Sequence, residues 1–132
     1  MKKNTYINLA NKSANLQIQE LKKIKKVFNQ SFVRAVDLIL NCKGKVIFAG
    51  IGKSGLIARK ISATFSSVGI PSFFCDPAQA LHGDMGQIEK KDILIIFSYS
   101  GNTSELSNML GYANRFRIKI IGVASKSDSL LL

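Results

Sequence analysis

Four serine and threonine hydroxyls and one glycine lie within seven residues, directly after an apolar run. The run covers residues 93–97, and it is followed by Ser98, Ser100, Gly101, Thr103 and Ser104. If a helix begins here, its first turn carries unpaired N–H groups and the positive end of the helix dipole. Glycine lets the backbone approach a ligand closely, so the junction is typical of a pocket for a phosphate monoester. The alternative is an ordinary strand-to-helix turn with a serine or threonine N-cap.

A second glycine-rich loop follows an earlier apolar run. Gly50, Gly52 and Gly55 have the spacing G-x-G-x-x-G, and Asp76 ends the next apolar run. That pattern fits a dinucleotide-binding turn with its ribose-binding acid. However, Lys53 lies inside the loop and suits an anionic sugar phosphate, and a pyrophosphate site does not need a second anion loop. A sugar phosphate is therefore favoured, and a nicotinamide dinucleotide remains the less favoured alternative.

The chain contains a single histidine, His82, in an irregular segment of residues 76–86. A lone histidine is more often structural, but this one is expected beside two anion loops, where a neutral imidazole can move a proton or hold a hydroxyl. One histidine without clustered cysteines predicts no metal site. Cys42 and Cys75 are isolated, so we expect buried small side chains rather than a disulfide.

The composition indicates one globular domain in 132 residues. The net charge of +11 comes largely from lysines in the first quarter of the chain, on what should be solvated helix faces. No recognition motif accompanies them, so we expect no nucleic-acid partner. No apolar run has the length of a membrane span, and the N-terminus lacks a signal-peptide pattern, so we expect no membrane association and a cytoplasmic protein.

The hydrophobic pattern predicts two leading helices, then strands that alternate with helices. Helices are expected over 5–28, 32–43, 57–68 and 106–113, and strands over 46–49, 72–75, 93–97 and 118–124. Continuous apolar strands between amphipathic helices indicate a parallel sheet covered on both faces, an α/β fold with ligands at the carboxyl ends of its strands. Residues 1–44 are expected to pack on the domain or on another subunit, and residues 45–132 to hold the site.

Three motifs in this order resemble one family. They are Gly-Ile-Gly-Lys-Ser-Gly at 50–55, Ala-Leu-His-Gly-Asp-Met-Gly at 80–86 and Ser-Tyr-Ser-Gly-Asn-Thr-Ser-Glu at 98–105. They resemble the sugar isomerase (SIS) domain and, more narrowly, the arabinose-5-phosphate isomerases of the KdsD/KpsF type. The resemblance implies a three-layer α/β/α fold with a mainly parallel, flavodoxin-like (Rossmann-like) sheet.

The resemblance also implies an activity. These enzymes interconvert D-arabinose 5-phosphate and D-ribulose 5-phosphate through an enediol, without a cofactor, on the way to the Kdo of lipopolysaccharide or capsule. By motif, the catalytic positions are Lys53, Glu105 and His82. The substrate-binding positions are Gly52, Ser54, Ser98, Ser100, Gly101, Asn102 and Thr103, together with His82. Which residue is the base stays open, since Lys53 could serve only to attract anions and Glu105 only to complement a helix N-terminus.

The chain also departs from the family pattern. Tyr99 stands where the family commonly has a small polar residue, and Leu56 where the isomerases often have histidine. The family assembles as a tetramer and continues past the fourth strand with segments that add a glutamate and a histidine, usually followed by CBS modules. We therefore expect a homo-oligomer, and we expect this chain to be the amino-terminal part of the domain, with little or no isomerase turnover by itself. A non-catalytic sugar-phosphate-binding module is the main alternative.

Overall fold

The computed structural model describes residues 3–132. It forms two compact units, which are described separately: residues up to Asp37, and residues Leu38–Leu132. The division into 1–44 and 45–132 that the sequence suggested stays a prediction.

The first unit is helical. Helix α1 covers Lys3–Lys23 and is followed by a 3-10 turn, η1, over Ile24–Val27, while α2 begins at Gln30 and runs to Leu40 in the second unit. The prediction of one helix over 5–28 was therefore wrong at its end. Continuing the α-helix would place the like charges of Lys22 and Lys26 at an unfavourable i,i+4 spacing.

Asn29 directly precedes α2 and caps its N-terminus. Its side-chain oxygen accepts hydrogen bonds from the backbone N–H groups of Ser31 (2.8 Å) and Phe32 (3.4 Å). These bonds satisfy two amides that a helix N-terminus otherwise leaves unpaired. The α-helix ends at Leu40 rather than near Lys43, where its expected end lay.

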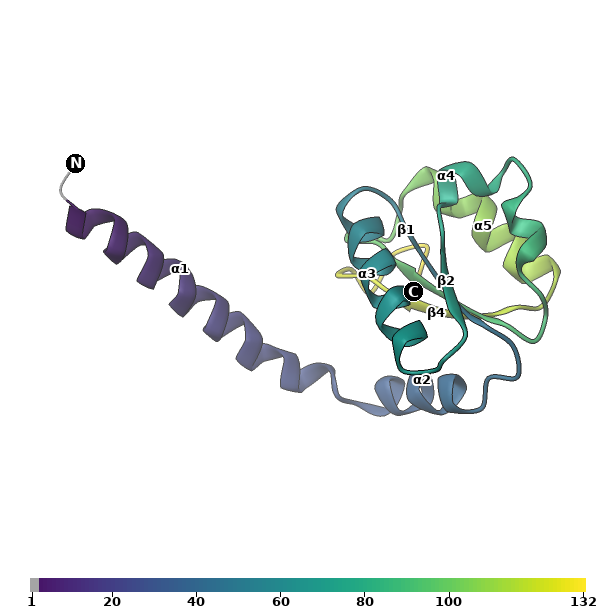
Figure 1. The fold of residues 1–132 in the computed structure, drawn as a ribbon, viewed down its shortest axis with the longest axis horizontal. Coiled ribbons are helices and arrows are strands. Elements are labelled where there is room, and N and C mark those ends of the chain that lie inside the picture. The colour runs from purple at the N-terminus through teal and green to yellow at the C-terminus, as the bar shows by residue number, and fades with distance from the viewer. Residues whose placement is uncertain (1–2) are drawn as a thin grey trace. The chain divides into compact units, whose positions relative to one another are not determined.

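The second unit is built on a four-stranded parallel sheet. Its strands are β1 (Val46–Gly50), β2 (Ser72–Cys75), β3 (Ile93–Phe97) and β4 (Lys119–Val123), in the order β2-β1-β3-β4. The apolar runs of the two central strands are buried because helices cover both faces of the sheet (Figure 1). The predicted parallel α/β architecture is confirmed.

Alternate residues of the central strands serve opposite layers. Val46 and Phe48 pack on the face covered by α3 (Lys53–Ser67), together with Leu38 and Ile39 from the end of α2. Ile47 and Ala49 pack on the other face, against α5 (Ser104–Arg115) and the short α4 (Pro77–Ala80). The result is a three-layer α/β/α unit.

The hydrophobic pattern that predicted a helix over 57–68 marks the buried face of α3 only in part. Ile57 and Val68 are exposed, whereas the buried positions of the helix are Gly55, Ala58 and Ser62. A Cβ atom at Gly55 would lie 2.5 Å from the carbonyl oxygen of Gly50. The helix therefore approaches β1 so closely that small residues face the sheet.

The strand order creates a crevice. From β1 the chain leaves toward β2 on one side, and it then returns to β3 on the other side of β1. The loops that follow β1 and β3 consequently diverge, and a ligand site in an open parallel sheet lies at such a switch point.

Candidate functional site

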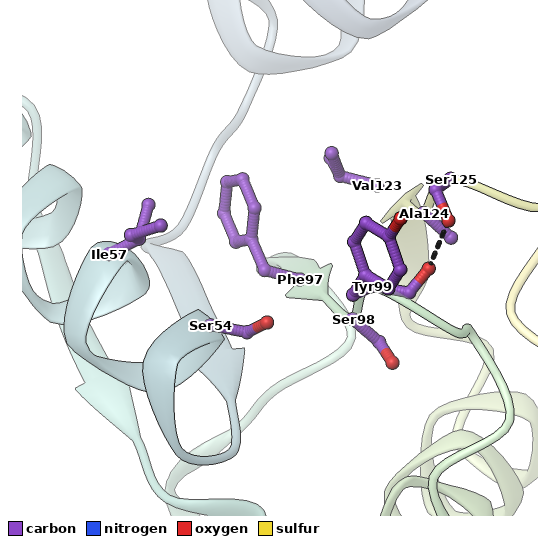
Figure 2. Close-up of a pocket in the computed structure, with 8 residues that line it drawn as sticks. All are labelled: Ser54, Ile57, Phe97, Ser98, Tyr99, Val123, Ala124 and Ser125. Atoms are coloured by element: carbon purple, nitrogen blue, oxygen red, sulfur yellow. Dashed lines mark hydrogen bonds between the residues drawn. The ribbon is translucent and has the colours of Figure 1, made fainter. Parts of the chain in front are cut away.

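Two adjoining hollows lie at the carboxyl ends of the strands. The first, of about 320 Å³, is drawn in Figure 2, and the second measures about 390 Å³. Both are lined by Ser54, Phe97, Ser98 and Tyr99. The first adds Ile57, Val123, Ala124 and Ser125, and the second adds Ile51, Lys53, Ser100 and Thr103. The second hollow therefore gathers the cation and the hydroxyls that the sequence singled out.

The segment Ser98–Thr103, called the anion loop below, is braced from within. The buried Ser98 hydroxyl accepts the backbone N–H of Gly101 at 3.0 Å and shares a hydrogen bond with the Thr103 hydroxyl at 3.1 Å. Gly101 has a φ of 71°, which favours glycine. Ser98 thus shapes the loop, while Ser100 and Thr103 line the hollow.

Backbone donors remain available in this loop and at the start of α5. Thr103 is the N-cap of α5, but its side chain makes no capping hydrogen bond. Within residues 3–132, the backbone N–H groups of Ser100 and Ser104 donate no hydrogen bond to another group. A helix N-terminus with free N–H groups and adjacent hydroxyls is suited to a phosphate group.

The turn after β1 brings a lysine to the same hollow. Gly52 has a φ of 58° and precedes α3, so that Lys53 and Ser54 form the start of the helix. Both side chains line the second hollow together with Ser100 and Thr103. In the described part of the chain Lys53 has no ion-pair partner, so its charge is available to an anionic ligand.

Glu105 lies in the first turn of α5 and is occupied locally. Its own backbone N–H and the Ser104 hydroxyl, at 2.8 Å, lower the pKa of its carboxyl group. Glu105 is consequently ionised at neutral pH, and it lines neither hollow. Its expected catalytic role stays a prediction.

His82 lies in a turn between two short helical segments. It is exposed in the turn between α4 and the 3-10 segment η2 (Asp84–Gln87), and it lines neither hollow. The structure thus does not bring it to the lysine and the hydroxyls, and its role also stays a prediction.

The side-chain oxygens of Asp76 and Asn102 are each engaged by a backbone N–H group. The Asp76 carboxylate accepts the N–H of Ala78 at 3.0 Å and caps α4, which weakens its candidacy as a ribose-binding acid. The Asn102 side-chain oxygen accepts the N–H of Leu130 at 2.8 Å, so one acceptor position of this amide is taken within the chain.

Sequence motifs missed several lining residues. Phe97 ends β3, Val123 ends β4, and Ser125 lies two residues after the end of β4. The rule that ligands sit at the carboxyl ends of parallel strands could have found them. The motif analysis did not find these three residues because none of the three motifs includes them.

Neither cysteine lines the two hollows. Both are free, with Cys75 in the core and Cys42 half-buried. Burial, aided by Asp84 and Asp76, raises the pKa of the Cys75 thiol to about 11. Among the described residues, no group of three or more His, Cys, Asp or Glu side chains is arranged to hold a metal ion.

Comparisons with known proteins agree with this geometry. The chain is 41% identical over 125 residues to arabinose 5-phosphate isomerase GutQ of Escherichia coli K12, covering 95% of this chain and 39% of the relative. A probable arabinose 5-phosphate isomerase of Haemophilus influenzae is 40% identical over 126 residues, covering 96% of this chain and 37% of that protein. The chain thus spans about two fifths of the length of these relatives.

Solved structures share the fold. An Escherichia coli CFT073 protein in complex with arabinose 5-phosphate superposes with a TM-score of 0.92 and 34% identity, covering 99% of this chain and 70% of that one. A putative sugar-phosphate isomerase of Listeria monocytogenes superposes with a TM-score of 0.93 and 31% identity, and the match covers 99% of this chain and 69% of that one. The SIS domain family itself matches residues 39–131, which include the sheet and both hollows. The chain therefore belongs to the SIS domain family.

Proposed function

We propose that this chain carries the sugar-phosphate site of an aldose–ketose isomerase that interconverts D-arabinose 5-phosphate and D-ribulose 5-phosphate. The observation that carries the proposal is the meeting of the anion loop and Lys53 in one hollow. Further support comes from relatives named arabinose 5-phosphate isomerase and from the likeness to a protein in complex with that sugar phosphate.

The phosphate is assigned to the anion loop. The hydroxyls of Ser100 and Thr103 and the free N–H groups at the start of α5 would donate to its oxygens, and Lys53 would add a positive charge. Hydrogen bonds to a charged acceptor are stronger than those between neutral groups. This arrangement favours a dianionic phosphate ester over an uncharged sugar.

The isomerisation moves one proton between neighbouring carbons. A base removes the proton from carbon 2 of the aldose, the carbonyl oxygen on carbon 1 takes up a proton, and an enediol results. Return of a proton to carbon 1, with loss of the proton from the oxygen on carbon 2, gives the ketose. We assign the proton transfers to Lys53, Glu105 and His82, and the order of their roles stays open.

Solvent exchange tests the chemistry separately from net turnover. D-Arabinose 5-phosphate is incubated with the chain in D2O, and the carbon-2 proton is followed by NMR. We expect that signal to disappear, and we expect Lys53→Ala to slow its loss more than tenfold, within the ~10²–10⁴ range of general acid–base catalysis. Lys60→Ala is the matched control because Lys60 is also an exposed lysine of α3. Equal rates in both variants would contradict the role of Lys53.

A non-catalytic sugar-phosphate-binding module is the second candidate. It is favoured by Glu105, whose carboxylate is engaged at its own helix N-terminus, and by His82, which lines neither hollow. Saturable binding of pentose 5-phosphate without loss of the carbon-2 proton would select this candidate.

We also propose that the chain acts as a homo-oligomer in the cytoplasm. Supporting the first point, α1 exposes large apolar side chains, including Ile18 and Leu21, that a second copy could cover. None of the helices in residues 3–132 combines the length and the apolar character needed to cross a bilayer.

A further inference from the structure

A backbone loop binds an anion only when its N–H groups point toward the ligand and its carbonyl groups point away. In a trans peptide unit the carbonyl and the following N–H point in opposite directions. A group that binds the carbonyl from one side therefore turns the next N–H to the other side. The question for the anion loop is what holds its carbonyls.

The segment Ser125–Leu131, called the strap below, holds two of them. The carbonyl of Tyr99 accepts hydrogen bonds from the Ser125 hydroxyl at 2.6 Å, drawn in Figure 2, and from the Ser125 N–H at 3.1 Å. The carbonyl of Gly101 accepts the N–H of Leu131, also at 3.1 Å. The peptide units before Ser100 and before Asn102 are thus fixed from the side of the strap.

Packing keeps the strap against the loop. A Cβ atom at Gly101 would collide with the Ser129 hydroxyl oxygen, and Ser129 is buried. The Asn102 side-chain oxygen adds the 2.8 Å bond from the Leu130 N–H. The strap thus contacts the anion loop through the loop's backbone carbonyls, through Gly101 and through the Asn102 side chain.

We infer that the strap orients the peptide units of the anion loop, with Ser125 and Asn102 as positioning residues that hold it. With the Tyr99 and Gly101 carbonyls bonded to the strap, the N–H groups of Ser100 and Asn102 are turned away from it. The Ser100 N–H is then free for phosphate, and the Asn102 N–H is held only at 3.3 Å by the Ser100 hydroxyl. Phosphate affinity accordingly depends on residues of the strap as well as on the loop.

This inference rests on the proposed function of the loop, and the test separates the two. Ser125→Ala removes the shortest strap contact, Ser125→Thr keeps a hydroxyl, and Ser127→Ala is a control for an exposed serine of the same segment. Affinity for inorganic phosphate is measured by calorimetry. Amide hydrogen exchange of Ser100 and Gly101 is measured without ligand, and thermal unfolding verifies that each variant folds.

We expect Ser125→Ala to weaken phosphate binding about two- to tenfold, the range that one hydrogen bond between neutral groups contributes. The Gly101 amide should exchange faster in that variant, while the Ser125→Thr and Ser127→Ala variants behave as the unchanged protein does. Unchanged exchange and unchanged affinity in Ser125→Ala would overturn the inference. If the unchanged protein binds no phosphate, the proposed function of the loop fails, and the exchange data alone decide whether the strap orients the loop.

Discussion

The serine and threonine side chains of the anion loop divide between two tasks. Ser98 is buried and braces the loop through Gly101 and Thr103. Ser100 and Thr103 line the second hollow, where a ligand can reach their hydroxyls. Alanine at Ser98 would therefore change loop shape, whereas alanine at the other two positions removes donors.

Replacing both Ser100 and Thr103 with alanine tests the second task. Each hydroxyl is expected to donate to a charged acceptor, so each loss should cost about 1.5–3 kcal/mol of binding free energy for pentose 5-phosphate. Calorimetric titration of the folded double variant measures the loss. Ser107→Ala is the matched control, because Ser107 is an exposed serine further along α5. Wild-type affinity in the double variant would remove these hydroxyls from the site.

Asp92 is a buried carboxylate at the opposite ends of the strands. It accepts the N–H groups of Lys45 and Glu89, both at 2.8 Å, and lies 3.1 Å from the Lys45 ammonium. Burial alone would raise the pKa of Asp92, but these hydrogen bonds and the lysine charge outweigh it and lower the pKa. A lowered pKa in the folded state means that the ionised form stabilises the fold.

We predict that Asp92→Asn lowers the free energy of unfolding by about 1–3 kcal/mol at neutral pH. The stabilisation is complete above the ordinary pKa of 3.8 and is lost as the pH falls below it, so the two proteins should converge in acid. Urea titrations at several pH values measure this. Glu89→Gln, which removes an exposed partner of the same lysine, should change the free energy of unfolding much less than Asp92→Asn does. A constant difference between Asp92→Asn and the unchanged protein at every pH would contradict the account.

At the scale of elements, the start of α5 depends on one glycine. Gly101 combines a φ of 71° with direct contact to Ser129, so a methyl group there meets both backbone strain and a clash. Gly111, in the same helix, has open space around its Cβ position.

Gly101→Ala should lower the free energy of unfolding by at least about 2 kcal/mol. The same substitution should weaken phosphate binding, because it distorts the anion loop. Gly111→Ala should instead raise the free energy of unfolding by ~0.5–1 kcal/mol, because alanine is a better helix former than glycine. Chemical denaturation compares the pair. Equal stability of the two variants would show that the loop tolerates a side chain at Gly101.

The sequence predicted which segments form helices and strands, but it did not predict which side chains pack together. Continuous apolar runs predicted the four parallel strands, and the hydroxyl cluster predicted the loop at the end of β3. Periodicity misplaced the buried face of α3, because Gly55 and Ala58 carry little apolar signal although the helix packs closest there. The strap contacts of Ser125 and Asn102 join residues 26 and 28 positions away, which no local pattern records.

At the scale of the molecule, the exposed apolar surface of α1 predicts self-association. Ile18 and Leu21 are 51% and 66% exposed. Glutamate at both positions should convert an oligomer into a monomer in sedimentation experiments at micromolar concentration, because charge burial is unfavourable. Gln17→Glu controls for added charge on the same helix. A monomeric unchanged protein would contradict the prediction.

The topology of the second unit leads to the central claim. Because the loops that follow β1 and β3 diverge at the switch point, the Lys53 turn and the anion loop face one hollow, where we place a sugar phosphate. The most direct test is an amide NMR titration of the chain with D-arabinose 5-phosphate, with D-arabinose as the control. The account predicts saturable shifts concentrated at residues 51–54 and 98–104 that require the phosphate. Shifts confined to other residues, or equal shifts with the uncharged sugar, would contradict it.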